Sequence, residues 1–583
     1  MNVLVPVIVG ALGLWLGSRF YGRYVAKRLG VDPSRTTPAV ERSDGLDFVP
    51  TKIPVLFAHH FSAIAGAGPI LGPTIALLFG FAPGWLWVVL GGIFFGAAHD
   101  LAALFASVRQ GGKSMAEVAR SSLGSSGFAL FILFTLVLIV LVTSAFLAAT
   151  AVSLTSMWPA AKLGVDTADT WMRVGDVDGE PLVVIGGIAS MSVVIITVLS
   201  PVLGWLIYKR GISTVKAYVL ATLVCIGSVV LGVMCPICLD PNIWMVILSI
   251  YVLLAAGLPV WLILQPRDFI NVQILYVGII GLVAGLVVAG IGGLSMSAPL
   301  LSLDRAAQAA TLGALWPFLF TTIACGAISG FHCMVATGTT AKQVASERSL
   351  KTLAFDGMLL ESLLALCVIV VVGSALTFED YAAVVHPVAA GAKSNPILAF
   401  SLSVGNLLNR AFAIPTAGGT VFGILLVEGF VVTTLDAAVR INRYLFEELW
   451  NILFKGRQPR LLRHHWVNSG LSVVLMWVLA YTNAFQAIWP VFGSANQMLA
   501  ALALIAVSAW LMSSGRWPLF TLLPAAAMLV TTIGTLVLLA PRYYEAQQWS
   551  LLAADLSLMA LSVALVAVAA RRILAIRRSW KAA

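Results

Sequence analysis

Residues 59–73 read HHFSAIAGAGPILGP, which places three glycines and two prolines inside an otherwise apolar stretch. Pro69 and Pro73 have no amide hydrogen and their rings clash with the preceding turn, so a straight helix is not expected here. We expect the chain to unwind around Gly66 to Gly68, leaving free carbonyl groups on one half-helix and free N–H groups on the other. Inside a membrane, such a break is tolerated only where it is buried in protein or lines a cavity.

The composition of the whole chain is that of an integral membrane protein. Of the 583 residues, 60% are hydrophobic and 10% are charged, whereas soluble domains carry about 25% charged residues. The net charge of +10 would suit nucleic acid, but the basic residues cluster in short loops between apolar segments, as in cytoplasmic loops of membrane proteins. We therefore expect membrane lipid, and no nucleic acid, as a partner.

Fifteen apolar runs are long enough to cross the hydrocarbon core, which takes about 20 helical residues. They cover approximately 3–21, 54–80, 83–107, 128–154, 183–207, 214–234, 242–264, 272–292, 311–337, 355–376, 413–440, 467–484, 488–512, 516–540 and 549–570. A shorter run, 395–410, carries Asn406 and Arg410 and is expected to be interfacial or re-entrant.

The basic residues also predict the orientation of these spans. If the N-terminus is outside, all but six of the 35 Lys and Arg residues fall in inner loops or the C-terminal tail. The positive-inside rule therefore predicts a multi-pass protein of the cytoplasmic (inner) membrane, with its N-terminus outside and its C-terminus inside. No basic residue precedes the first run, so it is expected to be a retained helix and not a secretory signal. The longest outer loop, 155–182, is acidic.

A second interruption, Gly257-Leu258-Pro259, falls in the span 242–264. Five spans over 54–234 start with the first interruption, and five over 242–440 start with the second and run in the opposite orientation. This is the pattern of inverted-repeat secondary transporters. The predicted fold is therefore an all-α polytopic membrane protein with a five-plus-five, leucine-transporter-like (APC-type) core, unless both interruptions are only packing kinks. Residues 1–53 would add a helix and a cytoplasmic loop, and residues 467–583 a C-terminal group of four helices.

Several longer blocks resemble one known family. They are DGLDFVPT at 44–51, HHFSAIAGAGP at 59–69, LPVW and QPRD within 258–268, CGAISGFH at 325–332, and the Trp-Pro, Phe-Gly and Ala-Asn-Gln-Met-Leu-Ala groups within 489–500. Together they resemble signature blocks of the carbon starvation protein A (CstA) family over most of the chain. The resemblance implies a nutrient transporter of the inner membrane that is used when carbon is short. Peptide uptake is associated with the family and, in some members, pyruvate uptake coupled to protons.

The two interruptions are the predicted substrate site. Half-helix N-termini offer unpaired N–H donors and a partial positive charge, which suit a carboxylate. Only glycine lets the backbone approach a ligand without a Cβ in the way. The predicted substrate-binding residues are Gly66, Ala67, Gly68, Pro69, Gly257 and Pro259.

Ionisable side chains within the apolar spans are the predicted coupling residues, because a charge in the membrane is costly and usually functional. They are His59, His60, His99, Asp100, His332 and Glu428. The His/Asp group can relay protons, since histidine titrates near neutral pH. It can equally bind a transition metal or clamp two helices together.

Three hydroxyl groups join this list of coupling residues. Thr321, Thr322 and Ser329 are expected to form a cation site with the carbonyls of 63–66, unless they only bond their own helix. Glu428 is expected to carry a proton or to pair with Arg410 or Arg440. Arg267 and Asp268 are expected to form an inner ion pair or gate.

The sequence contains no complete enzyme or cofactor-binding motif that we can identify. The stretch from Gly111 to Ser114 resembles the end of a phosphate loop, but Ser107 occupies the position of the first glycine and no strand precedes it. No cofactor is expected. Cys235 and Cys238 form a CxxC in a predicted outer loop, where free or bridged thiols are favoured over half of a metal site.

The leading hypothesis is a secondary active transporter, a proton symporter that imports a small carboxylate such as pyruvate. A short-peptide transporter is the alternative within transport. A solute-binding membrane sensor is the alternative from another class, although no sizeable soluble output domain accompanies the spans.

Overall fold

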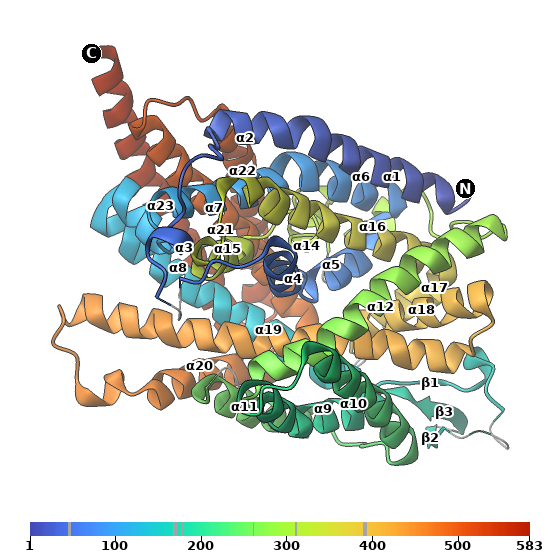
Figure 1. Ribbon diagram of the computed structural model, residues 1–583. Helices are drawn as coiled ribbons and strands as arrows, with labels where there is room; N and C mark the ends of the chain where they lie inside the picture. The colour runs from blue at the N-terminus through green and yellow to red at the C-terminus, as the bar shows by residue number, and fades with distance from the viewer. Residues whose placement is uncertain are drawn as a thin grey trace.

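The computed structural model describes residues 1–44, 48–166, 170, 172–177, 179–259, 262–308, 312–388 and 393–582. The chain is mostly helical (Figure 1). Predicted segments at 45–47 and 260–261, within two of the family blocks, lie outside these described residues.

The helices of the first half are α1 (Leu4–Leu16), α2 (Arg23–Leu29), α3 (Pro38–Glu41), α4 (Ile53–Ile64), α5 (Gly68–Ala76), α6 (Phe81–Gly91), α7 (Ala97–Arg109), α8 (Met115–Ser153), α9 (Ile185–Tyr208), α10 (Thr214–Met234), α11 (Pro241–Gly257) and α12 (Leu264–Ile291). Those of the second half are α13 (Leu303–Gln308), α14 (Leu315–Thr322), α15 (Phe331–Gly338), α16 (Gly357–Ala375), α17 (Phe378–Val385), α18 (Pro396–Phe412), α19 (Thr416–Leu453), α20 (His465–Thr482), α21 (Phe485–Ser513), α22 (Leu519–Glu545) and α23 (Trp549–Ala582).

A small antiparallel sheet interrupts the helices. Its strands are β1 (Met157–Pro159), β2 (Val174–Val177) and β3 (Glu180–Val184), in the order β1-β3-β2. The sheet and the N-terminus lie at one end of the molecule, and the C-terminus lies at the other (Figure 1). Which end faces the cytoplasm stays a prediction, both for the loop 155–182 and for the two termini.

Eleven helical segments of the described chain are long and apolar enough to cross a membrane, so the protein is a multi-pass membrane protein. Their number is below the fifteen expected runs because several predicted spans are divided or short. The predicted span 54–80 is split into α4 and α5, and α11 has only 17 residues. The run 395–410 forms α18, a 17-residue helix that packs against α19 and α16.

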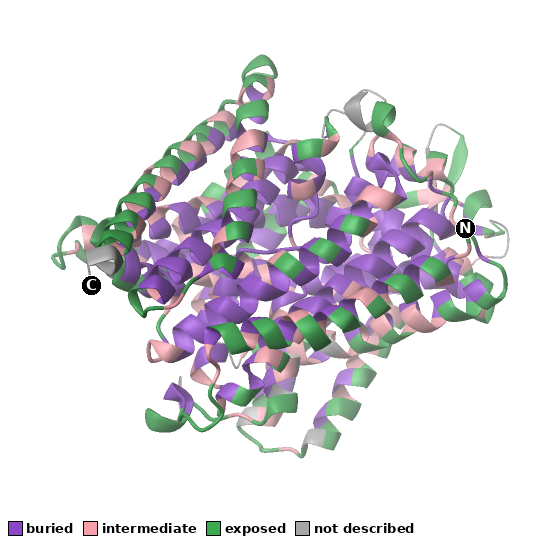
Figure 2. Cartoon of the chain, turned by 90° about the horizontal axis from the view of Figure 1, so that it is seen from above, coloured by how far each residue is buried: buried purple, intermediate pink, exposed green. Residues whose placement is uncertain are grey.

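Burial separates a core bundle from peripheral helices (Figure 2). In the most apolar stretch of α21, 94% of the residues are buried inside the protein. In the corresponding stretch of α10, only 22% of the residues are buried. Because α10 contains little polar surface, its exposed apolar side chains fit contact with lipid. The core is formed by the segment with α6 and α7 and by α8, α16, α19 and α21, in which 72% to 94% of the residues in the most apolar stretch are buried inside the protein.

Two core helices are broken. Between α4 and α5, residues 65–67 are not helical, and we call this segment the first break. Between α14 and α15, residues 323–330 are not helical, and we call this the second break. The first break confirms the expectation drawn from its glycines and prolines. The predicted span 311–337 is divided by the second break. The sequence does not indicate this break, because residues 323–330 contain no proline.

The Gly257–Pro259 interruption has a different place in the fold. Helix α11 ends at Gly257 and α12 begins at Leu264, so the segment connects two helices. Arg443 donates to the carbonyl of Ala256 at 3.0 Å, and Arg440 donates to the carbonyls of Ala255 and Leu258. These two side chains of α19 satisfy the C-terminal carbonyls of α11, which would otherwise lack partners.

Candidate functional site

The first and second breaks lie against each other at the centre of the bundle. A Cβ added to Gly68 would stand 2.4 Å from the Cβ and the Sγ of Cys325. One added to Gly72 would stand 2.7 Å from the carbonyl oxygen of Thr322. Real Cβ atoms do not approach that closely, so glycine at both positions is what allows the two unwound segments to touch.

A small cavity of about 20 Å³ opens beside the two breaks. This volume holds about one water molecule. The cavity is lined from five parts of the fold, namely the two breaks with their flanking turns, α8, α19 and α21. The lining residues are Ala63, Ile64, Gly66, Gly68, Leu138, Val142, Phe146, Cys325, Ser329, Phe331, Thr434, Phe492 and Asn496.

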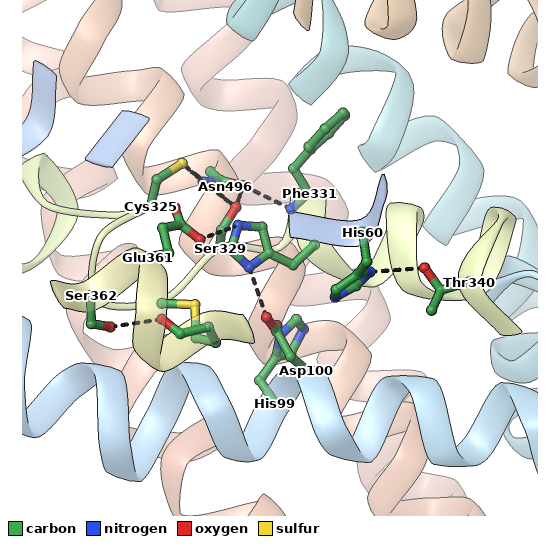
Figure 3. Close-up of polar contacts among 12 residues, drawn as sticks. His60, His99, Asp100, Cys325, Ser329, Phe331, Thr340, Glu361, Ser362 and Asn496 are labelled. Atoms are coloured by element: carbon green, nitrogen blue, oxygen red, sulfur yellow. Dashed lines mark hydrogen bonds and ion pairs between the residues drawn. The ribbon is translucent and has the colours of Figure 1, made fainter. Parts of the chain in front are cut away.

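The two half-helix N-termini at this cavity differ in how their N–H groups are satisfied. The side-chain oxygen of Asn496 accepts from the N–H of Phe331 at 3.0 Å, and its backbone oxygen accepts from the N–H of Gly330 at 3.0 Å. The N-terminus of α15 is therefore capped by α21 (Figure 3). At the first break, the N–H of Gly66 bonds to Ile64, whereas those of Ala67 and Gly68 have no acceptor among the described residues.

A chain of buried ionisable groups starts one residue beyond the cavity. His332 is hydrogen-bonded through Nδ1 to an oxygen of Asp100 at 2.8 Å, and its Nε2 lies 3.1 Å from a carboxylate oxygen of Glu361. The other oxygen of Asp100 is 2.7 Å from Nδ1 of His99. All four side chains are at most 1% exposed. Figure 3 shows Asp100 and His99 on α7, with Glu361 on α16 facing the same centre.

His60 approaches this chain from α4. Its Nδ1 lies 2.8 Å from the hydroxyl of Thr340, and its Nε2 has no partner in the described structure. The ring packs near Gly357, whose added Cβ would be 3.6 Å from the His60 Cδ2. Gly357 is one helical turn before Glu361 on α16. His60 therefore lies beside the helix that carries Glu361, while the neighbouring His59 is exposed.

Glu428 occupies a separate buried position. It is fully buried on α19, and its carboxyl group faces the hydroxyls of Thr150 and Ser153 on α8. The expected pairing with Arg440 is wrong, because that guanidinium bonds to carbonyls at the end of α11. Arg410 is exposed on α18 and is not joined to Glu428 by any ion pair among the described residues.

Several predicted residues do not meet at the cavity. The hydroxyl of Thr321 bonds to Phe318 of its own helix and lies 3.4 Å from the hydroxyl of Thr535 on α22. The carbonyl of Thr322 accepts from the indole of Trp489 at 3.3 Å. Ser329, in contrast, lines the cavity and bonds to Asn496. Neither threonine is among the described residues that line the cavity, and their expected cation site with the carbonyls of 63–66 stays a prediction.

Gly257 and Pro259 are also absent from the described lining of the cavity. A Cβ on Gly257 would meet the ring of Trp466 on α20. The expected pair Arg267–Asp268 is replaced by another ion pair, because Nη1 of Arg267 is 3.0 Å from the Asp436 carboxylate. The hydroxyl of Tyr251 also donates to Asp436, so this buried group ties α11 and α12 to α19.

Two residues of the site were not singled out from the sequence. Glu361 is a carboxylate inside the apolar run 355–376, and the depth rule applied to His99 and Asp100 would have found it. Asn496 lies in one of the family blocks, but only the three-dimensional contact shows that it caps the second break. Among the described residues, no group of three or more His, Cys, Asp or Glu side chains is placed to hold a metal ion.

Comparisons with known proteins agree with the membrane architecture. Residues 2–390 and 374–535 match the model of the family described as "Carbon starvation protein CstA". The Peptide transporter CstA of Escherichia coli (strain K12) is 32% identical, with 91% of this chain and 80% of the relative covered. The Peptide transporter CstA of Bacillus subtilis (strain 168) is 29% identical, with 91% and 89% covered.

A second named activity occurs among the relatives. The Pyruvate/proton symporter BtsT of Escherichia coli (strain K12) is 31% identical, with 90% of this chain and 80% of the relative covered. Among solved structures, a manganese transporter from Eremococcus coleocola aligns over 92% of this chain and 99% of its own, with a TM-score of 0.48 and 11% identity.

Proposed function

The chain belongs to the carbon starvation protein CstA family of membrane transporters, and on that premise we propose that it is a proton symporter importing a small carboxylate such as pyruvate. The observation that carries the proposal is the cavity at the two breaks, with an open half-helix N-terminus on one side and buried ionisable groups immediately behind it. A short peptide is the second candidate substrate, because relatives named as peptide transporters are equally similar.

The carboxylate would bind at the N-terminus of α5. The N–H groups of Ala67 and Gly68 have no acceptor among the described residues, and the half-helix dipole adds a partial positive charge there. Because α5 has nine residues, it is long enough to carry that charge. The cavity of about 20 Å³ must widen to admit a substrate larger than water, and the apolar side chains of Leu138, Val142 and Phe146 on α8 would then contact the rest of a small substrate.

The lining favours a simple carboxylate over a peptide. A peptide has an amino terminus whose positive charge needs a carboxylate partner when it is taken out of water. None of the described residues that line the cavity is acidic. Pyruvate has no amine and needs only the N–H donors and apolar contacts.

The coupled proton would pass through the group formed by His60, Asp100, His332 and Glu361. A buried charge is costly unless it is paired. A proton that binds to His332 or leaves it would therefore change the contacts of His332 with Asp100 and Glu361. His332 follows Phe331, which lines the cavity; its Nδ1 is hydrogen-bonded to Asp100 on α7, and its Nε2 lies 3.1 Å from the Glu361 carboxylate on α16. Protonation would therefore alter contacts between α15 and those two helices.

An inverted five-plus-five core remains part of the proposal, with revised boundaries. The first repeat would contain α4–α5, α6–α7, α8, α11 and α12, and the second α14–α15, α16, α19, α20 and α21. Corresponding helices have similar lengths: 39 and 38 residues for α8 and α19, 17 and 18 for α11 and α20, and 28 and 29 for α12 and α21.

Packing supports this correspondence. Helix α8 packs on α21 as α19 packs on α12, and α8 packs on α20 as α19 packs on α11. The hairpin α9–α10 would then be an insertion in the first repeat. The earlier boundaries at 54–234 and 242–440 counted that hairpin as two core spans and treated the Gly257 interruption as the second broken helix.

Substrate uptake into proteoliposomes tests the function. The purified chain is reconstituted and given radiolabelled pyruvate or a radiolabelled dipeptide under an imposed inward proton gradient or an inward sodium gradient. We expect pyruvate to accumulate above its external concentration with the proton gradient only. Dipeptide accumulation without pyruvate uptake would establish the second candidate, and binding without accumulation of either would support a sensor.

A further inference from the structure

A second and larger cavity lies away from the breaks, where α9 and the end of α10 meet the segment that enters the small sheet. Its volume is about 630 Å³. The residues that line it are Met172, Arg173, Met191, Val233, Met234, Cys235, Pro236 and Ile237. Four of these eight side chains contain sulfur, although the chain has only 15 methionines and six cysteines.

A fifth sulfur atom is held next to this cavity by the backbone. The N–H of Ile237 donates to the carbonyl of Gly187 on α9 at 3.0 Å, which fixes the loop after α10 against α9. As a result, Sγ of Cys238 lies 3.2 Å from the position that a Gly187 Cβ would take. Met191 is one turn further along α9, on the same face as Gly187. The sulfur atoms thus come from three separate elements.

The two cysteines differ from the other four in the chain. Cys235 and Cys238 are exposed and unbridged, whereas Cys225, Cys325, Cys333 and Cys367 are half-buried or buried. Met234 is 71% exposed at the end of α10, where lipid contact accounts for its exposure. The two exposed thiols of the loop after α10 have no such explanation.

The ligand types indicate the ion. Thiolates and thioethers are soft ligands and together favour Cu⁺, whereas zinc sites take four cysteine, histidine or carboxylate ligands and do not use thioethers. None of the described residues that line the cavity is His, Asp or Glu. We propose that one Cu⁺ ion binds at the edge of this cavity, through the thiolate of Cys235, which lines it, and the thiolate of Cys238, which lies beside it, with thioether contacts from Met191 and Met234.

Charge and proton balance are consistent with such a site. Binding of Cu⁺ by two thiols forms two Cu–S bonds, and the two thiol protons pass to the solvent, so the bound group carries one negative charge. The guanidinium group of Arg173 lines the same cavity and supplies a positive charge. No electron is transferred. The site shares no lining residue with the cavity at the breaks, so its occupancy does not depend on the proposed substrate.

The test is a competition for Cu⁺ between the full-length purified chain and the coloured bicinchoninate chelate, in detergent, with oxygen excluded and a phosphine reductant present. We expect one Cu⁺ per chain to leave the chelate. The variant C235S/C238S should remove none at the same chelator concentration. The variant M191L/M234L should bind roughly tenfold more weakly, comparable to the loss of a supporting ligand.

Two single variants serve as matched controls. C225S removes a half-buried thiol in the middle of α10, and M476L changes a buried methionine of α20, and both should bind Cu⁺ like the wild type. Wild-type melting temperature and substrate uptake in C235S/C238S would show that this variant is folded. X-ray absorption of the loaded protein should show sulfur scatterers alone.

Three results would overturn the proposal. They are a wild-type chain that leaves all Cu⁺ in the chelate, a serine double variant that takes up as much Cu⁺ as the wild type, and displacement of Cu⁺ by equimolar Zn²⁺. A mass lower by two hydrogens in a Cys235–Cys238 peptide from freshly isolated membranes would also overturn it, because the thiols would then be a disulfide.

Discussion

The contact between the two breaks gives a prediction that depends on single atoms. In G68A the new Cβ would stand 2.4 Å from the Cβ and Sγ of Cys325, so the breaks must separate by about 1 Å to reach the 3.4 Å of ordinary contact. Overpacking of this kind costs about 1–3 kcal/mol. If that cost falls on the conformation with both breaks in contact, its population drops by roughly 5- to 150-fold.

A second substitution tells a steric effect from any other. In G68A/C325A the cysteine is shortened but its Cβ remains, so the 2.4 Å contact persists and uptake should stay low. In G68A/C325G the nearest remaining atom is the Cα of residue 325 at 3.9 Å, which is ordinary contact. We therefore expect G68A/C325G to transport at about the rate of C325G alone, which corresponds to a coupling energy of about 1–3 kcal/mol in the cycle.

The assay is initial uptake of labelled substrate into proteoliposomes, normalised to the amount of inserted, monodisperse protein. G227A is the matched control, because a Cβ on this helical glycine of α10 meets nothing within 4 Å. It should transport like the wild type. Normal uptake by G68A would refute the claimed contact between the breaks. Equal rescue by C325A and C325G would show that the thiol, and not the Cβ, is responsible.

Three further predictions concern coupling, orientation and stability. H60Q should keep substrate exchange at equilibrium but lose accumulation driven by a pH gradient, since exchange moves no net proton. Normal accumulation would make His60 structural and leave the coupled proton to Asp100, His332 and Glu361. In a C235S/C238S background, V174C should react with an impermeant thiol reagent added outside intact cells and K455C should not, and the reverse pattern would invert the orientation. R267L should lower the melting temperature strongly, because removing one partner of a buried ion pair costs about 3–5 kcal/mol. The double variant R267L/D436L should recover most of that loss. Equal melting temperatures for the two variants would show that the pair contributes little.

The sequence predicted the membrane class, most of the helices and the first break, because each has a local physical cause. Apolar length marks the spans, and Pro69 and Pro73 between glycines mark the unwound turn. The limits of α10, expected at 214–234 and observed at Thr214–Met234, agree to the residue. Buried polar residues were found by the same rule of depth, which gave His60, Asp100 and His332.

The second break was missed because its cause is not local. Residues 323–330 contain no proline, and the turn is held by contacts from elsewhere, notably the hydrogen bonds from Gly330 and Phe331 to Asn496. The Gly257–Pro259 segment was misassigned for the opposite reason, since a glycine and a proline also end one helix before the next begins. Which partner each ionisable group takes likewise depends on helix packing, as Arg267 with Asp436 and Arg440 with the end of α11 illustrate.

The central claim is that uphill substrate movement is coupled to protons through the buried group around His332. The most direct measurement is proton entry, followed with a pH-sensitive dye trapped in proteoliposomes, while labelled pyruvate is imported by the wild type, by E361Q and by the control S362A. The account predicts proton entry that follows pyruvate entry in the wild type and in S362A, and pyruvate exchange without net proton entry in E361Q. Pyruvate-driven proton entry in E361Q at the wild-type rate would contradict it.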